Sequence, residues 1–121
     1  MELKLFDSEL KVMETLWKAG GDLPAGQIAK ILQEETGWNR NTTYTVIKKC
    51  IAKGAIRRSD PKFRCHALIT RKQVQSYETG ELIDKMFDGS RQKFFAAFLA
   101  DGELTDEEIL QLKEMVSGLE K

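Results

Sequence analysis

The hydrophobic repeat of this chain changes at Gly54, and the change restricts which folds its N-terminal part can adopt. Before Gly54, apolar residues recur every three or four positions in three successive segments, which is the spacing of one face of an α-helix. After it, residues 55–59 and 63–69 alternate imperfectly between apolar and polar side chains, with a turn at 60–62, as two short β-strands do. We therefore expect a mainly α-helical protein with a small β-hairpin.

Caps and stops mark the three helices. The first is expected over 7–19, with Asp7 or Ser8 as its N-cap. The second begins with Pro24 in its first turn, and the third begins after Asn39, a good N-capping residue. The glycines expected to end the helices are Gly20, Gly21, Gly37 and Gly54. The apolar stripe of the first helix is Phe6, Leu10, Met13 and Trp17, and that of the second is Ala25, Ile28, Ala29 and Leu32. The third helix has the stripe Thr43, Val46, Ile47, Cys50 and Ile51. Trp17 and Trp38 are expected in the core.

Positive charge is concentrated in the middle of the chain. Residues 40–72 contain ten basic residues and one acidic residue, a net charge of +9, whereas residues 1–39 carry −3 and residues 73–121 carry −6. The total is zero, so the overall composition hides this distribution. A basic segment between acidic ones indicates a site for a polyanion. The alternative is a solvated basic face without a partner.

The third helix carries short polar side chains opposite its apolar stripe. A DNA major groove admits one α-helix, and side chains of this kind can reach the base edges there. The other possibility is that the threonines of this helix are only poor helix formers on a solvated face. Three helices followed by a hairpin is the order of a winged helix-turn-helix, which would place the hairpin cations against phosphate. The candidate DNA-binding residues are Arg40, Asn41, Thr42, Tyr44, Thr45 and Lys48 in the helix and Arg58, Lys62 and Arg64 in the hairpin.

The last third of the chain is acidic, helical and rich in aromatic residues. Helices are expected over about 71–88, over 90–100, and after a capping box formed by Thr105 and Glu108. Three short helices have difficulty burying so many large side chains alone, so we expect them to pack against a second copy of the chain. The division is then 1–71 for a winged-helix DNA-binding domain and 72–121 for a helical dimerisation domain. The candidate dimerisation residues are Phe87, Phe94, Phe95, Phe98, Ile109, Leu112 and Val116.

The segment Gly37–Lys49, followed by Lys53-Gly54-Ala55-Ile56, resembles the penicillinase repressor family, and so does the tail segment Leu104–Ile109. The resemblance covers nearly the whole chain. It implies a dimeric winged-helix repressor that binds a palindromic DNA operator. It also implies that Thr42, Tyr44 and Thr45 lie on the base-reading face, with Arg40 and Asn41 on the leading edge of the helix.

The chain departs from that family pattern in two places. Members that are induced by proteolysis are cut at an Asn-Phe bond in the C-terminal helices, and the matching bond here is Ala97-Phe98. Copper-responsive members end in CxC motifs, whereas this chain has no cysteine after Cys65. The inducing protease or sensor is therefore left open.

No catalytic constellation is recognisable, so we expect neither an enzyme nor a cofactor. Cys50, Cys65 and His66 make a poor metal site, because two of them are adjacent in a strand and no fourth ligand follows. The chain has no apolar run of the ~20 residues that a membrane span needs and no signal-peptide pattern, so a cytoplasmic location is expected. Two other functions stay open: a winged-helix module that binds an acidic protein, and a metal or thiol sensor acting through Cys50 and Cys65.

Overall fold

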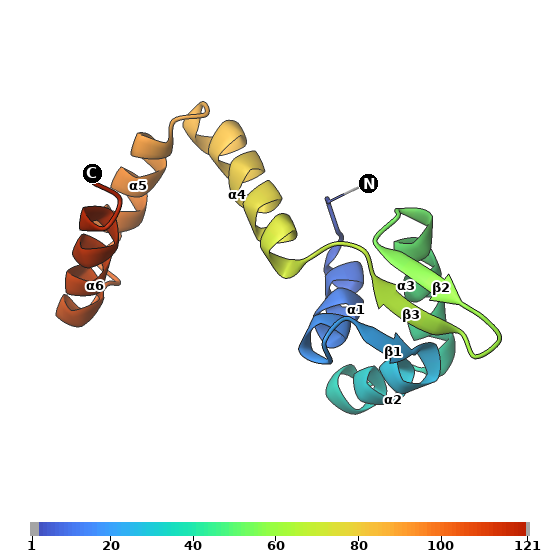
Figure 1. Ribbon diagram of the computed structural model, residues 1–121. Coiled ribbons are helices and arrows are strands. Elements are labelled where there is room, and N and C mark those ends of the chain that lie inside the picture. The colour runs from blue at the N-terminus through green and yellow to red at the C-terminus, as the bar shows by residue number, and fades with distance from the viewer. Residues whose placement is uncertain (1–2, 121) are drawn as a thin grey trace. The chain divides into compact units, whose positions relative to one another are not determined.

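Helices and strands follow one another in the order that the sequence indicates, with one additional strand. The computed structural model describes residues 3–120. In that range the elements are α1 (Asp7–Lys18), β1 (Asp22–Pro24), α2 (Ala25–Thr36), α3 (Arg40–Ala52), β2 (Ile56–Ser59), β3 (Arg64–Ala67), α4 (Arg71–Phe87), α5 (Arg91–Ala100) and α6 (Asp106–Ser117) (Figure 1). None of the helices in this range is both long and apolar enough to cross a membrane.

The first compact unit covers residues 1–79, and its sheet has the strand order β1-β3-β2. The predicted hairpin is confirmed as β2 and β3, and its turn projects away from the helices (Figure 1). Strand β1 was not expected. It is antiparallel to β3, with Leu23 opposite Cys65. A strand of three residues that ends in proline is too short to produce a recognisable alternation.

The core of this unit contains the predicted stripes of α2 and α3, whereas the stripe predicted for the first helix was wrong. Phe6 and Leu10 are 67 and 36% exposed, and α1 instead buries Val12, Met13 and Leu16. Helices α1, α2 and α3 pack against one another and against the sheet. The prediction for the tryptophans was wrong, because Trp17 and Trp38 are only partly buried at the edge of the core. An indole bears a polar N–H that needs a partner, and the Nε1 of Trp17 donates to the backbone oxygen of Ile69 at 2.9 Å. The main buried side chains are Val12, Met13, Leu16, Ala25, Ile28, Leu32, Val46, Ile47, Cys50, Ile56, Cys65, Ile69 and Val74.

Two of the predicted helix ends are confirmed in detail. Asn39 caps α3 by accepting a hydrogen bond from the Thr42 amide at 2.8 Å, and Gly37 ends α2 in a left-handed conformation with φ of 78°. The expected cap of α1 by Asp7 or Ser8 was wrong. The N-cap position is Phe6, and the carboxylate of Glu9 accepts its amide hydrogen at 2.7 Å.

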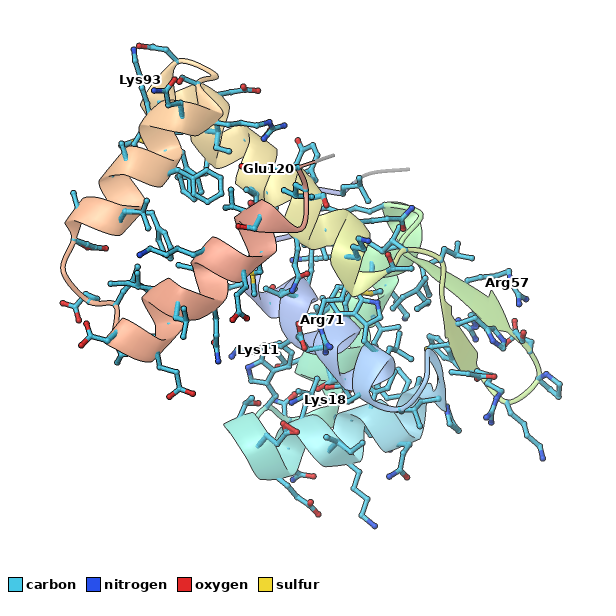
Figure 2. All side chains as sticks on the ribbon, turned by 60° about the vertical axis from the view of Figure 1, so that its left-hand side comes forward. Lys11, Lys18, Arg57, Arg71, Lys93 and Glu120 are labelled. Carbon is cyan, nitrogen blue, oxygen red and sulfur yellow. The ribbon has the colours of Figure 1, made fainter. Side chains whose placement is uncertain are left out.

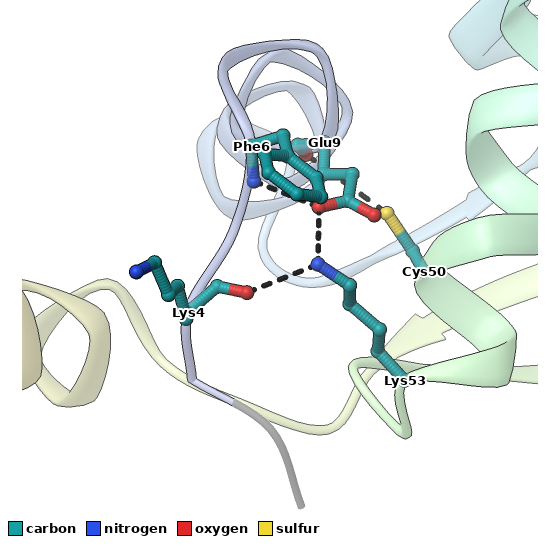
Figure 3. Close-up of polar contacts among 5 residues, drawn as sticks. All are labelled: Lys4, Phe6, Glu9, Cys50 and Lys53. Carbon is teal, nitrogen blue, oxygen red and sulfur yellow. Dashed lines mark hydrogen bonds and ion pairs between the residues drawn. The ribbon is translucent and has the colours of Figure 1, made fainter.

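That carboxylate belongs to a buried ion pair that was not predicted. Glu9 is 1% exposed, and its Oε1 lies 2.6 Å from the Nζ of Lys53 at the end of α3 (Figure 3). The same Nζ donates to the backbone oxygen of Lys4 at 3.1 Å and lies 4.5 Å from the ring centroid of Phe6. Lys53 places a cation at the C-terminal end of α3, where it is the C-cap residue. It also holds the segment before α1 against the end of α3.

The second compact unit covers residues 80–121 and begins inside α4. The capping box of Thr105 and Glu108 is present, with hydrogen bonds of 3.0 and 3.1 Å. Phe94 makes ring contacts with Phe87 and with Phe98, at centroid distances of 5.5 and 6.4 Å. Helix α4 begins at Arg71, next to the expected domain boundary, and the separation of DNA binding from dimerisation at that boundary stays a prediction.

Candidate nucleic-acid interface

Helix α3 buries one face and exposes the other, as its sequence indicates. Thr43, Val46, Ile47 and Cys50 are buried. The candidate DNA-binding residues Asn41, Thr42, Thr45 and Lys48 are exposed on the opposite face. The buried stripe fixes the rotation of the helix about its axis, so these polar side chains are directed away from the core.

The hydroxyl groups of α3 are not equivalent. Thr45 Oγ1 donates to the backbone oxygen of Asn41 at 2.9 Å, so that side chain presents lone pairs and a methyl group outward. The Oγ1 of Thr43 is buried and has no hydrogen-bond partner among the described residues. Thr43 is therefore part of the core, and Thr45 and Thr42 are the threonines available to a ligand.

Arg40 and Tyr44 interact one helical turn apart. The Nη2 of Arg40 donates to the Tyr44 hydroxyl at 2.9 Å, and its Cζ lies 4.9 Å from the centroid of the Tyr44 ring. Tyr44 is partly buried, with its ring edge-on to Phe63 at 5.5 Å and 85°. The phenolic proton is still free to be donated, because the hydroxyl acts as an acceptor toward Arg40.

The wing, defined here as residues 56–67, carries cations of two kinds. Arg58 forms an ion pair with Asp60, with Nε 2.9 Å from Oδ1, and Arg64 forms one with Asp22 at 2.7 Å. Lys62 is exposed in the turn. Arg57 is exposed as well (Figure 2), and its Nη1 donates a hydrogen bond of 3.4 Å to the Ser59 hydroxyl. The wing thus holds two partly neutralised arginines beside cations that make no ion pair within residues 3–120.

A polar network crosses all three strands. The Nε2 of His66 lies 2.8 Å from the Ser59 hydroxyl, and its Nδ1 lies 3.4 Å from Oδ2 of Asp22. The other oxygen of Asp22 is buried and is compensated only by the ion pair with Arg64. His66 is half-buried, and each of its ring nitrogens has a partner. The importance of Asp22 was missed, because a lone acid near a turn gives no signal in the sequence.

The two thiols lie in the core. Cys50 and Cys65 are free and buried. Burial, reinforced by the Glu9 carboxylate, raises the pKa of Cys50 to about 12, and burial raises the pKa of Cys65 to about 11. Thiols with such pKa values are poor nucleophiles and poor metal ligands at neutral pH. Across residues 3–120, no three His, Cys, Asp or Glu side chains are grouped so that they could hold a metal ion.

Three helices, a three-stranded sheet and an exposed polar helix beside a basic hairpin define a winged-helix protein. The model of the penicillinase repressor family matches residues 5–118, so the chain belongs to that family. It is similar to the penicillinase repressor of Bacillus licheniformis, with 23% identity over 115 residues, which cover 93% of this chain and 89% of that protein.

The fold is also similar to a solved structure, the solution structure of the DNA binding domain of the repressor BlaI. The two share 26% sequence identity with a TM-score of 0.52, over 56% of this chain and 84% of that domain. The predicted fold class and family are thereby confirmed. Membership in a repressor family makes this chain a regulator and not an enzyme, and the three comparisons support a DNA-binding repressor.

Proposed function

We propose that this chain is a homodimeric, cytoplasmic transcriptional repressor that reads a palindromic DNA operator with α3 and holds the phosphates with the wing. The observation that carries the proposal is the exposed polar face of α3, which lies beside a wing with four basic residues, Arg57, Arg58, Lys62 and Arg64. A base-reading surface next to phosphate-binding cations is the arrangement that sequence-specific recognition requires.

Each candidate residue has a chemical role in this proposal. Thr42, Tyr44 and Thr45 face the base edges, with hydroxyl groups and methyl groups that suit adenine and thymine contacts. Arg40 and Asn41 occupy the first helical turn, where free backbone amides also favour a phosphate. Lys48, Arg58, Lys62 and Arg64 supply charge. Thr45→Ala is expected to relax sequence preference, whereas Lys62→Ala is expected to weaken binding to all duplexes alike.

The dimer in this proposal forms through the second unit. Phe95, Phe98, Ile109 and Val116 are 52, 41, 38 and 57% exposed, which is unusual for apolar residues so close together. Phe95, Ile109, Leu112 and Val116 line one apolar groove of about 470 Å³ between α5 and α6. Phe87 of α4 and Phe94 and Phe98 of α5 line a second hollow, together with other residues of α4. A second copy would cover these surfaces.

DNA binding is tested by selecting duplexes from a random library with the full chain. An enriched palindrome is expected, together with a log–log salt slope of roughly −5 to −9 for a dimer that makes about six to ten phosphate contacts. A slope near zero, or no enriched sequence, would contradict the proposal. Binding to an acidic protein without duplex binding would favour the interaction module instead.

The dimer is tested by sedimentation of the full chain. Val116→Glu places a charge in the apolar groove and is expected to give monomers. Gln111→Glu adds the same charge about 140° away around α6 and serves as the control, because at 100° per residue it lies on another face. Equal dimerisation of the two variants would contradict the proposed surface.

A further inference from the structure

Phe63 occupies an unusual position in the turn of the wing. Its φ is +48°, a left-handed conformation that bulky residues seldom adopt. Its backbone oxygen accepts the amide hydrogen of Ala25, the first residue of α2, at 2.9 Å. Its ring is partly buried against the core. The backbone of the turn is therefore fixed to the helical part of the domain at this residue.

The ring of Phe63 connects the wing with α3. The guanidinium carbon of Arg58 lies 3.6 Å from the centroid of the ring, which is the distance of a stacked cation–π contact. Tyr44 meets the same ring edge-on. Tyr44 is also in contact with Arg40, which donates to its hydroxyl and lies over its ring. Four side chains therefore form one continuous stack that begins in α3 and ends in the wing. We call Arg40, Tyr44, Phe63 and Arg58 the stack.

Helix α2 closes the stack at the Arg40 end. A Cβ atom at Gly26 would lie 3.7 Å from both Nη2 of Arg40 and the hydroxyl of Tyr44. The Arg40 guanidinium thus lies between Gly26 of α2 and the Tyr44 ring. A guanidinium held by its face keeps the N–H groups of its edge available for an acceptor.

We propose that Phe63 is a positioning residue for DNA readout, one that holds the wing and α3 in a single register. The inference rests on the proposed function. Base recognition needs side chains within a fraction of an ångström of their productive positions, so a rigid connection between the two contacting elements favours the matching sequence. Phe63 itself adds nothing to phosphate binding, because its side chain has no charge. The stack therefore acts on discrimination and not on general DNA affinity.

The test compares two duplexes of equal length, one selected by the wild-type chain and one of random sequence. Phe63→Leu keeps an apolar side chain but removes the ring. It is expected to weaken binding to the selected duplex about tenfold and to leave the random duplex and the salt slope unchanged, since every cation remains. Phe63→Tyr retains the ring and is expected to bind the selected duplex within about twofold of wild type. Equal loss on both duplexes would overturn the inference.

A double-mutant cycle adds a readout that simple packing would not change. Arg40 and Phe63 are connected only through Tyr44 in the contacts described above. Arg40→Met and Phe63→Leu are therefore expected to be non-additive for the selected duplex, by more than about threefold, whereas independent residues add to within about twofold. Additivity would overturn the inference and leave the proposed function intact.

A second variant covers the case in which Phe63→Leu does not fold, as judged by circular dichroism. The Cβ of a valine at position 26 would already be in van der Waals contact with Arg40 and Tyr44. The two methyl groups beyond it in Gly26→Val are therefore expected to displace these side chains without touching the wing, and to cause the same selective loss. Wild-type affinity of this variant for the selected duplex would overturn the inference. A wild-type chain that prefers no duplex would refute the proposed function and this inference together.

Discussion

Replacing Lys53 by methionine leaves the Glu9 carboxylate buried without its cation. The carboxylate is 1% exposed and lies 2.6 Å from the lysine Nζ, whose side chain is 18% exposed. Removing one partner of a buried pair costs about 3–5 kcal/mol of folding free energy. The amide of Phe6 still donates to Glu9, and the Lys53 side chain is 18% exposed, so we expect a loss at or just below the lower limit of that range, about 2–3 kcal/mol.

Urea unfolding followed by circular dichroism measures this loss. With a slope of about 1–3 kcal/mol per molar urea, a loss of about 2–3 kcal/mol lowers the midpoint by roughly 0.7–3 M. Lys49→Met is the matched control, because Lys49 is exposed on the same helix, and its midpoint should barely move. If the two variants unfold at the same urea concentration, the ion pair contributes nothing and the reasoning is refuted.

A double variant separates the buried charge from lost packing. Glu9→Gln together with Lys53→Met removes both charges but keeps an oxygen that can accept the Phe6 amide hydrogen. Replacing both partners is expected to restore most of the stability that Lys53→Met loses. No recovery would mean that the other contacts of the lysine ammonium group, with the Lys4 backbone oxygen and the Phe6 ring, account for the effect, and not the uncompensated charge on Glu9.

Three further outcomes follow from individual contacts. Asp22→Asn releases Arg64 from its 2.7 Å ion pair, so binding to random duplexes should tighten and the log–log salt slope should steepen by about one in fluorescence anisotropy titrations. Because burial raises the pKa of Cys50 to about 12 and of Cys65 to about 11, the unfolded thiols ionise first. Their contribution to stability is thus complete below pH 9 and is lost as the pH rises through 11 to 12, and Cys65→Ala should flatten this decline in urea midpoints measured against pH. Gly37→Ala should lower the unfolding free energy by about 1–2 kcal/mol in the same urea assay, because φ is +78° there and a Cβ would meet nothing within 4 Å, which leaves backbone strain as the cause.

The elements that could be predicted from the sequence are those whose burial repeats along one segment. The stripe Ala25, Ile28, Ala29 and Leu32 is buried as its spacing indicates, because a helix places these positions on one side. Strand β1 could not be predicted in this way. Its three residues become a strand only by pairing with β3, 40 to 44 positions away along the chain. Pairing at that distance leaves no periodic signal.

The number of positive charges in the candidate site could be predicted from the sequence, but not which of them are free of a carboxylate partner. Four cations of the 40–72 segment are paired with acids: Lys53 with Glu9, Arg58 with Asp60, Arg64 with Asp22 and Arg71 with Glu14. Three of these acids come from residues 1–39, which is why a count along the segment overstates its free charge. The role of Phe63 was likewise hidden, because its partners come from three different elements.

This pairing changes how the basic residues would act in DNA binding. A cation that is already paired with a carboxylate exchanges one anion for another when it binds a phosphate, so its net contribution to the free energy of DNA binding is small. Lys48 and Lys62 make no ion pair within residues 3–120 and would contribute the full electrostatic term. Arg58 and Arg64 are held by their carboxylates in fixed positions, where the planar fork of each guanidinium still has N–H groups free for a phosphate. On this argument the lysines would supply affinity in the proposed DNA complex, and the paired arginines would restrict how the duplex is placed on the wing.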